Sequence, residues 1–302
     1  MANTVAAAEV LQWRRRQLEA GGEASHLDWL LDLGGGIRWQ TLQQLRLYPE
    51  QPVELEAPLQ RLEALWQQHL SSGVPLQYLV GRCPWRDLEL EVRPGALIPR
   101  QETELLIELA EQQLGSSGGV WSTDQRPSLR WADLGTGSGC LAVGLGRSWP
   151  GSRGVAVDQS REALALAQRN LSRYQLLERV ELRQGSWWAP LADMAGRLDL
   201  VISNPPYIPT AVWQNLEACV RDHEPALALD GGGDGLEAIR AIAAGAASHL
   251  APGGWLLLEH HHDQSSAVLA LLRAAGLEQV QAHRDLEGIW RFASGRRPGA
   301  TP

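Results

Sequence analysis

The sequence has no lysine, few cysteines and no long hydrophobic run. None of its apolar stretches approaches the roughly 18–20 residues that cross a bilayer, so we expect no membrane-spanning segment. Three cysteines (Cys83, Cys140 and Cys219), odd in number and without metal-ligand spacing, argue against a disulfide framework and favour the reducing cytoplasm. The apolar N-terminus is followed by arginines at 14–16, whereas a signal peptide has its basic residues first, so we expect the start of an amphipathic helix here.

The chain also has fewer basic than acidic residues. All 27 basic residues are arginine, against 35 acidic residues, and the formal net charge is −8. Proteins that hold nucleic-acid duplexes usually carry a basic face, because neutralised phosphates supply much of the affinity. We therefore expect a protein or a small molecule as substrate, and no direct nucleic-acid substrate. With 302 residues, 44% of them hydrophobic, the chain can form one large domain and a smaller one.

Helical patterns dominate the N-terminal quarter of the chain. Apolar residues recur at helical spacing over 5–18, 27–33 and 55–70, and Ser25 is a candidate N-cap. We predict a helical domain over residues 1–74. From the pattern, it is either a helical bundle without chemistry of its own or a docking module for a partner.

The pattern changes at residue 75. Positions 78–81 and 88–92 alternate in the manner of strands on either side of a polar turn, which predicts a β-hairpin linker over 75–95. A helix is then predicted to run from 98 to about 114. The Gly/Ser/Pro-rich segment 116–128 is predicted to be a surface loop.

Short apolar runs and helical patterns alternate through the rest of the chain. The predicted strands are 129–134, 154–158, 180–183, 198–203, 255–259, 280–284 and 289–293. The helices predicted among them begin near 140 and span 161–174, 237–250 and 266–275. These β-α repeats predict a Rossmann-like α/β domain over 96–302. Such a domain has a mostly parallel twisted sheet flanked by helices, and it binds ligands at the carboxyl ends of its strands.

A glycine-rich turn follows the first of these strands. Its glycines are spaced Gly-x-Gly-x-Gly, whereas dinucleotide enzymes use Gly-x-Gly-x-x-Gly, and position 140 is a cysteine. A ligand without a pyrophosphate has less need of a bare helix N-terminus. We predict a cofactor-binding loop, made of Gly135, Thr136, Gly137, Ser138 and Gly139.

Two further residues are candidates for the same cofactor. Asp158 ends the next strand, about twenty residues past the glycines, where a carboxylate meets ribose hydroxyls in such folds. The alternative role for Asp158 is the N-cap of the following helix. One strand later, Trp187 is placed to cover an adenine, although it could instead be a core tryptophan, and for Trp188 the core is favoured.

The strand 198–203 leads into the sequence Asn204-Pro205-Pro206-Tyr207. Two prolines fix φ and remove two amide donors, so the loop is stiff. The Asn204 side-chain oxygen and the Pro205 carbonyl can each accept one N–H of a planar NH2 group, which leaves its lone pair aimed at an electrophilic methyl. Tyr207 can stack on the flat group and face a cationic sulfonium. The alternative is that this loop has only a structural role, as a Pro-Pro turn after a strand.

These motifs strongly resemble those of the peptide chain release factor N5-glutamine methyltransferases, a family of class I S-adenosylmethionine-dependent enzymes. The resemblance covers nearly the whole chain from Pro75. It is carried by 75–81, 94–104, the two loops just described, 224–229, 233–236, 253–260 and 285–286.

The resemblance implies an activity and a set of roles. S-adenosylmethionine would donate its methyl group to the side-chain N5 of the glutamine in a Gly-Gly-Gln motif of a release factor, leaving S-adenosylhomocysteine. The helical domain would help to hold the factor. Asn204, Pro205, Pro206 and Tyr207 would bind the glutamine amide, with Asn204 also next to the cofactor. The cofactor itself would be bound by Gly135, Thr136, Gly137, Ser138, Gly139, Asp158 and Trp187.

The chain departs from the family pattern at three places. Gln101 stands where proline is usual, Ser186 where an acidic residue is common, and His261-His262 where a glycine-aromatic pair is usual. Three successive histidines, from His260, invite a metal hypothesis. Adjacent side chains on an extended segment point to opposite faces, so we predict no metal site.

Three other functions remain open from the residues. A nucleic-acid methyltransferase acting on adenine N6 or another rRNA base would handle a similar NH2 group, but such enzymes usually add a basic or aromatic face for the flipped base. An enzyme that methylates a ribosomal-protein glutamine would have identical chemistry. A scaffold that has lost its site is disfavoured by the complete loops. No Ser/His/Asp or Cys/His arrangement stands near 204–207, in keeping with a reaction that needs no strong general base.

Overall fold

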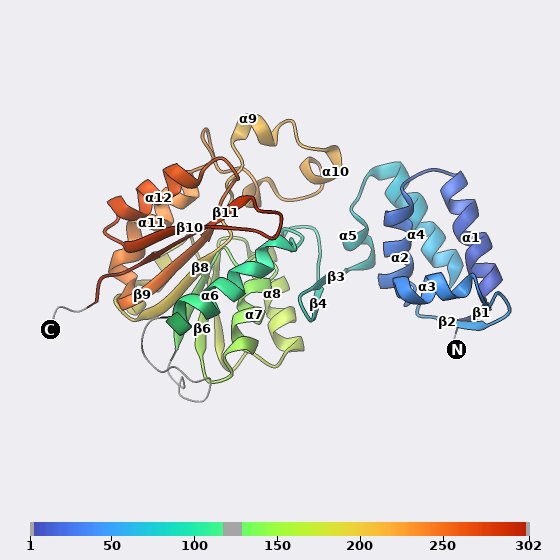
Figure 1. Cartoon of the computed structure of the whole chain (residues 1–302), viewed down its shortest axis with the longest axis horizontal. Coiled ribbons are helices and arrows are strands. Elements are labelled where there is room, and N and C mark those ends of the chain that lie inside the picture. The colour runs from blue at the N-terminus through green and yellow to red at the C-terminus, as the bar shows by residue number, and fades with distance from the viewer. Residues whose placement is uncertain (1–2, 117–128, 300–302) are drawn as a thin grey trace. The chain divides into compact units, whose positions relative to one another are not determined.

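A computed structural model describes residues 3–116 and 129–299 (Figure 1). The predicted surface loop over 116–128 therefore lies, apart from Ser116, outside the described residues. The chain divides into two compact units. The smaller comprises Met1–Cys83 together with Glu217–His223, and the larger comprises Pro84–Leu216 and Glu224–Pro302. None of the helices in the described part of the chain is both long and apolar enough to cross a membrane.

The smaller unit is mainly helical. Its helices are α1 (Ala7–Glu19), α2 (Ala24–Leu33), α3 (Trp39–Leu45), α4 (Leu59–Ser72), α5 (Leu76–Val80) and α10 (Ala218–Arg221). Helices α1 to α5 enclose a core in which Trp13, Leu30, Leu62 and Trp66 are fully buried. The short helix α10 comes from far along the chain, and next to it the His223 ring lies with Nε2 2.9 Å from the backbone oxygen of Ser72.

Several details of this unit differ from the sequence-based predictions. β1 (Asn3–Ala6) pairs antiparallel with β2 (Pro52–Leu55), within a segment that was predicted to be a helical domain. Strand pairing between segments some fifty residues apart leaves little local signal, because each strand is only four residues long. Ser25 does not cap α2, since the N-cap is Glu23 and Ser25 lies within the helix.

The predicted strand at 78–81 is wrong, because these residues belong to α5 and its cap. Pro75 precedes the helix, and Gly81 follows it in the left-handed conformation, with φ at 79° and its N–H donating to Gln77 O. This is the usual way for a helix to end at glycine. The hairpin consists instead of β3 (Arg82–Trp85) and β4 (Leu88–Glu91).

Side chains of this hairpin enter the larger unit. Trp85, Leu88 and Leu90 are buried in a large hydrophobic core of that unit. The Glu91 N–H donates to Asn170 Oδ1 at 2.8 Å, and the Asn170 amide donates back to Glu91 O at 2.9 Å. Most of the segment predicted as a linker is therefore built into the core of the larger unit.

The larger unit is a seven-stranded sheet with helices on both faces (Figure 1). Its strands are β5 (Arg130–Leu134), β6 (Arg153–Asp158), β7 (Val180–Gln184), β8 (Leu198–Ser203), β9 (Leu250–Glu259), β10 (Glu278–Arg284) and β11 (Trp290–Arg296). Their order is β10-β11-β9-β8-β5-β6-β7, and all of them run in the same direction except β11, which is reversed. The predicted Rossmann-like fold is confirmed.

Alternation along the strands divides the core into two layers. Trp131 and Ala156 face the layer that contains α6 (Leu105–Ser116), α7 (Cys140–Ser148) and α8 (Arg161–Arg173). Ala132 and Val155 face the layer that contains α11 (Glu237–His249) and α12 (Ser265–Ala274). Successive strand residues point to opposite faces, so both layers are filled from one sheet. Shorter helices in the connections are Glu102–Glu104, Ala189–Met194, α9 (Thr210–Trp213) and Ala226–Ala228.

The order of the strands indicates where in the sheet a ligand site is expected. β5 and β8 are neighbours at the centre of the sheet, while β6 and β7 lie beyond β5, and β9, β11 and β10 lie beyond β8. The chain thus reverses direction across the sheet between β5 and β8. In parallel α/β sheets, a crevice opens at such a point, outside the carboxyl ends of the strands.

Candidate active site

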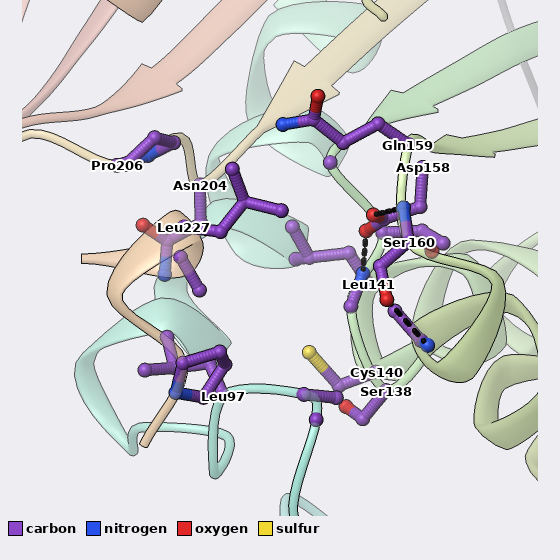
Figure 2. Close-up of a pocket in the computed structure, with 18 of the residues that line it drawn as sticks. Leu97, Ser138, Cys140, Leu141, Asp158, Gln159, Ser160, Asn204, Pro206 and Leu227 are labelled. Carbon is purple, nitrogen blue, oxygen red and sulfur yellow. Dashed lines mark hydrogen bonds between the residues drawn. The ribbon is translucent and has the colours of Figure 1, made fainter. Parts of the chain in front are cut away.

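A pocket lies at the carboxyl ends of β5, β6 and β8, entirely within the larger unit (Figure 2). Asp158 and Asn204 stand on opposite sides of it (Figure 2). Of the residues predicted for the site, those that line the pocket are Gly135, Thr136, Gly137, Ser138, Asp158, Trp187, Asn204 and Pro206. Gly139, Pro205 and Tyr207 are not among the lining residues, and their proposed ligand contacts stay predictions.

The glycine loop turns sharply between β5 and α7. Gly135 and Gly137 have φ of 76° and 55°, a region that side chains rarely adopt. The loop is tied to β6, because the N–H groups of Gly135 and Thr136 both donate to Val157 O at 2.9 Å. Gly135 and Gly137 both line the pocket, and because they have no side chains a ligand can approach their backbone closely.

Gly139 has a different function in the fold. It caps α7 with φ at 82°, and a Cβ there would lie 3.0 Å from the Ala167 Cβ in α8. The residue therefore permits two helices to pack closely. Sequence spacing could not separate this packing glycine from the two that face the pocket.

Asp158 is held by the loop that it faces. Its Oδ2 accepts the Gly137 N–H and its Oδ1 accepts the Ser160 N–H, both at 2.9 Å (Figure 2). The alternative that Asp158 caps the next helix is wrong, since Ser160 is the N-cap of α8 and accepts the Ala163 N–H. Burial raises the pKa of Asp158, although backbone donors partly offset the effect. A fixed carboxylate on the pocket wall is suited to accept hydrogen bonds from vicinal hydroxyls.

The two tryptophans after β7 are placed differently. Trp187 lines the pocket, and a Cβ at Gly135 would lie 3.4 Å from its ring. Its φ of 47° is unusual for a large side chain and is tolerated here at a cost of about 1–2 kcal/mol. Trp188 turns away, donating from Nε1 to Ile242 O at 3.0 Å and stacking on the His249 ring. Trp188 is thus a packing residue, as favoured from the sequence.

Asn204 takes part in a hydrogen-bonded chain that sequence reasoning missed. Its Nδ2 donates to Thr103 Oγ1 at 3.0 Å, and Thr103 Oγ1 donates to Glu259 Oε2 at 2.7 Å. The other oxygen of Glu259 accepts the Tyr207 hydroxyl at 2.9 Å. The amide nitrogen of Asn204 is therefore engaged, and Oδ1 is left as the acceptor of a side chain that lines the pocket.

The 204–207 loop is fixed by further contacts. Gln264 Nε2 donates to Tyr207 O at 2.9 Å and to Asp234 O at 3.2 Å. Burial raises the pKa of Tyr207 well above its ordinary value, with a further contribution from Glu259, so this hydroxyl remains a donor. The stiffness predicted from the two prolines is thus reinforced by Glu259 at the end of β9 and by Gln264 at the N-cap of α12.

An ion pair between Arg100 and Glu224 lies beside the pocket. The Glu224 carboxylate is almost fully buried and accepts from Arg100 Nη2 at 2.6 Å and from the Ile98 N–H at 3.1 Å. Arg100 itself lines the pocket. Both residues lie in segments that carry the family resemblance, and that was the only signal for them in the sequence.

The three histidines after β9 do not follow the predicted geometry. The chain turns at residues 262–263, and the rings of His261 and His262 lie together, with centroids 4.1 Å apart. The argument that adjacent side chains point to opposite faces is therefore wrong here. Ligand atoms of His261, His262 and Asp263 lie within 4.8 Å of one another, a spacing that could hold a metal ion. His260 is buried, which lowers its pKa.

The other two departures from the family pattern lie at the surface. Ser186 is exposed and lines the pocket beside Trp187. Gln101 is exposed and precedes the short helix that contains Thr103.

Known proteins share both the fold and the sequence. The family described as "Methyltransferase small domain" matches residues 114–231, which include both pocket loops. The catalytic domain of human METTL16, solved with an RNA hairpin, has a TM-score of 0.53 at 16% identity, covering 80% of this chain and 81% of that one. At that identity the likeness is one of fold alone, the class I methyltransferase fold.

Sequence relatives are much more similar. The release factor glutamine methyltransferase of Prochlorococcus marinus is 48% identical over 97% of this chain and 97% of its own length. The enzyme with the same name from Thermosynechococcus vestitus is 44% identical over 84% of each chain. The chain therefore belongs to the release factor glutamine methyltransferase family.

Proposed function

We propose that this chain transfers the methyl group of S-adenosylmethionine to the side-chain amide nitrogen of a glutamine in a peptide chain release factor. The observation that carries the proposal is the Asn204 amide at the pocket wall, with its nitrogen bonded to Thr103 and its oxygen left to accept. The names and coverage of the relatives support the same substrate.

The pocket is suited to S-adenosylmethionine. Asp158 offers a carboxylate for ribose hydroxyls, and Trp187 offers an aromatic face near the bare backbone of Gly135. Ser138 Oγ is buried at the pocket and has no hydrogen-bond partner within residues 3–116 and 129–299, as expected of a group that a ligand satisfies. The cofactor would supply an electrophilic methyl on a cationic sulfur.

The proposed reaction also requires that the side-chain amide nitrogen of the glutamine become nucleophilic. Its lone pair is delocalised into the carbonyl, so the nitrogen must be held with both N–H bonds directed at acceptors. Asn204 Oδ1 and Pro205 O would fill these two positions, and the work is positioning and electrostatics rather than proton abstraction at the start. This agrees with the lack of a strong base in the 204–207 loop.

The test is methyl transfer from labelled S-adenosylmethionine to a purified release factor. We expect one label per factor, located by mass spectrometry on the glutamine of its Gly-Gly-Gln motif, and none on a factor in which that glutamine is alanine. Ribosomal proteins and rRNA should be offered in parallel. Label on either of them, with none on the factor, would identify one of the alternative functions instead.

We also propose that the helical unit is the docking module for the release factor, acting in the cytoplasm. Three of its large apolar side chains are unusually exposed: Trp39 at 61%, Leu47 at 72% and Tyr48 at 62%. Exposed aromatic side chains are typical anchors in protein interfaces. With a net charge of −8, a nucleic-acid substrate is not expected.

A further inference from the structure

Asn204 can serve the proposed reaction in only one of its two amide orientations. The oxygen and nitrogen ends of the group have nearly the same shape, and a half-turn about the last side-chain bond exchanges them. With Oδ1 toward the substrate, Asn204 accepts an N–H. With Nδ2 there, it would present hydrogens to the hydrogens of the substrate NH2.

We propose that Thr103 and Glu259 are positioning residues that keep the Asn204 oxygen toward the substrate. The three side chains come from separate elements: the short helix before α6, the end of β9 and the loop after β8. Their contacts are 3.0 Å from Asn204 Nδ2 to Thr103 Oγ1 and 2.7 Å from Thr103 Oγ1 to Glu259 Oε2. This inference rests on the proposed function, since it specifies how the substrate amide is held.

Thr103 alone could not select the orientation. A hydroxyl both donates and accepts, so it could bond equally to either end of an amide. An ionised carboxylate only accepts. Because Glu259 takes the hydroxyl proton of Thr103, the Thr103 oxygen is left to accept, and only Asn204 Nδ2 can bond to it. Glu259 thus fixes the orientation of the Thr103 hydroxyl, and Thr103 in turn fixes the orientation of the Asn204 amide.

The surroundings of Glu259 make this direction costly to reverse. Thr103 and Glu259 are each only 1% exposed, so solvent does not offer replacement partners. The second oxygen of Glu259 accepts the Tyr207 hydroxyl, which links the start and the end of the 204–207 loop to one carboxylate. A buried donor or acceptor left without a partner costs about 1–3 kcal/mol, which favours the single arrangement that satisfies all of them.

The arrangement depends on the ionised form of Glu259. Burial raises the pKa of Glu259 to about 7, and Glu102 adds to this, while hydrogen bonds from Thr103 and Tyr207 and the charge of Arg291 on β11 act in the opposite direction. Protonated Glu259 must donate to a neighbour. If it donates to Thr103, the Thr103 hydroxyl turns toward Asn204 and favours the flipped amide. Turnover should therefore be present above about pH 7 and be lost as the pH falls through it.

The first experiment removes the hydroxyl group of Thr103. Thr103→Val keeps the shape of the side chain, and we expect kcat for methylation of the release factor to fall about 10- to 100-fold, with the dissociation constant for S-adenosylmethionine little changed. Thr103→Ser restores the hydroxyl and should recover most of the turnover. Thr210→Val is the matched control: its hydroxyl donates to Asp230 at 2.7 Å outside the pocket, so its loss should leave kcat unchanged.

Wild-type activity on the release factor, measured alongside, separates the two proposals. If wild-type protein does not methylate the factor, the proposed function fails. If wild-type protein is active and Thr103→Val is equally active, the positioning role fails. It fails also if Thr103→Val and Thr103→Ser lose activity equally together with thermal stability, because the residue would then act through packing.

The second experiment is a pH profile. We expect wild-type kcat to have an acid limb near pH 7 that Glu259→Gln lacks, with a lower plateau in the variant. Asp133 is also buried, and its pKa is likewise raised to about 7. A limb that survives in Glu259→Gln would therefore belong to Asp133 or another group, and would overturn the role of Glu259.

Discussion

At the scale of single residues, the site depends on an uncharged side chain. Asn204 does not itself titrate, so its electrostatic contribution is set by the direction of its amide, and the solution pH acts on that direction only through Glu259. That direction is fixed by its bond to Thr103. The charged groups nearby, Asp158 and Glu259, each use both carboxylate oxygens to hold other parts of the site in place.

Replacing Asn204 should separate chemistry from cofactor binding. We expect Asn204→Ala to lower kcat about 100-fold or more, as for the loss of one fixed polar group at a reacting centre. The dissociation constant for S-adenosylmethionine, measured by calorimetry, should change little, since the glycine loop, Asp158 and Trp187 remain. Asn215→Ala is the control, because that exposed amide donates to Ala211 O in its own turn.

The opposite result would assign a different role. A collapse of cofactor affinity with kcat retained at saturation would make Asn204 a binding residue only.

The sequence predicts the residues that belong to short motifs, but not the residues that orient them. Asn204 stands in a stiff loop after a strand, which is a local signal. Thr103 is 101 residues away from it, and Glu259 is 156 residues from Thr103. Their contact depends on β8 and β9 lying side by side, with Ser203 opposite Leu258. Nothing local in a single sequence reports that register.

At the scale of elements, the turn between β5 and α7 combines two tasks. Gly137 has φ of 55° and a Cβ there would meet no atom within 4 Å, so its freedom concerns the backbone and the pocket. Gly139 is tight against α8. One glycine-rich segment thus shapes a ligand site and sets the packing of two helices.

Alanine at these two glycines should give different phenotypes. We expect Gly139→Ala to lower the free energy of unfolding by about 2–3 kcal/mol, through backbone strain and overpacking against Ala167. Gly137→Ala should cost about 1–2 kcal/mol, from strain alone, and should weaken S-adenosylmethionine binding more strongly. Urea denaturation and calorimetry measure the two effects. Equal stability losses would show that the Ala167 contact relaxes at no cost.

Most helices and strands of the larger unit could be predicted from their apolar patterns, whereas the short helix α5 could not. The helix predicted over 161–174 is α8, Arg161–Arg173, and the strand predicted over 198–203 is β8. In contrast, α5 was predicted as a strand, because five residues are too few to show a helical period. Its boundaries are set by Pro75 and Gly81 rather than by apolar spacing.

At the scale of the whole molecule, the division into units does not follow the order of the chain. Glu217–His223 belongs to the helical unit, although the residues before and after it belong to the larger one. Glu224, directly after this segment, is anchored by Arg100 at the pocket. The sequence predicted two consecutive domains, because segment 217–223 carries no pattern that relates it to the N-terminal helices.

The docking role of the helical unit can be tested on its exposed side chains. We expect Trp39→Ser combined with Tyr48→Ser to raise KM for the release factor about fivefold or more, as for the loss of interface contacts worth about 1 kcal/mol. Neither kcat nor cofactor affinity should change. Leu286→Ser, at a side chain that is 90% exposed in the larger unit, is the matched control. An unchanged KM in the double variant would place the docking surface elsewhere.

The path of the chain between the units also limits how the protein can be recombined. The polypeptide passes from one unit to the other at 83–84, at 216–217 and again at 223–224. Residues 1–83 are consequently not a cassette that can be exchanged by a single crossover. A chimera that takes its helical unit from another protein must import two separate stretches, or α10 will be left against a surface to which it was not matched.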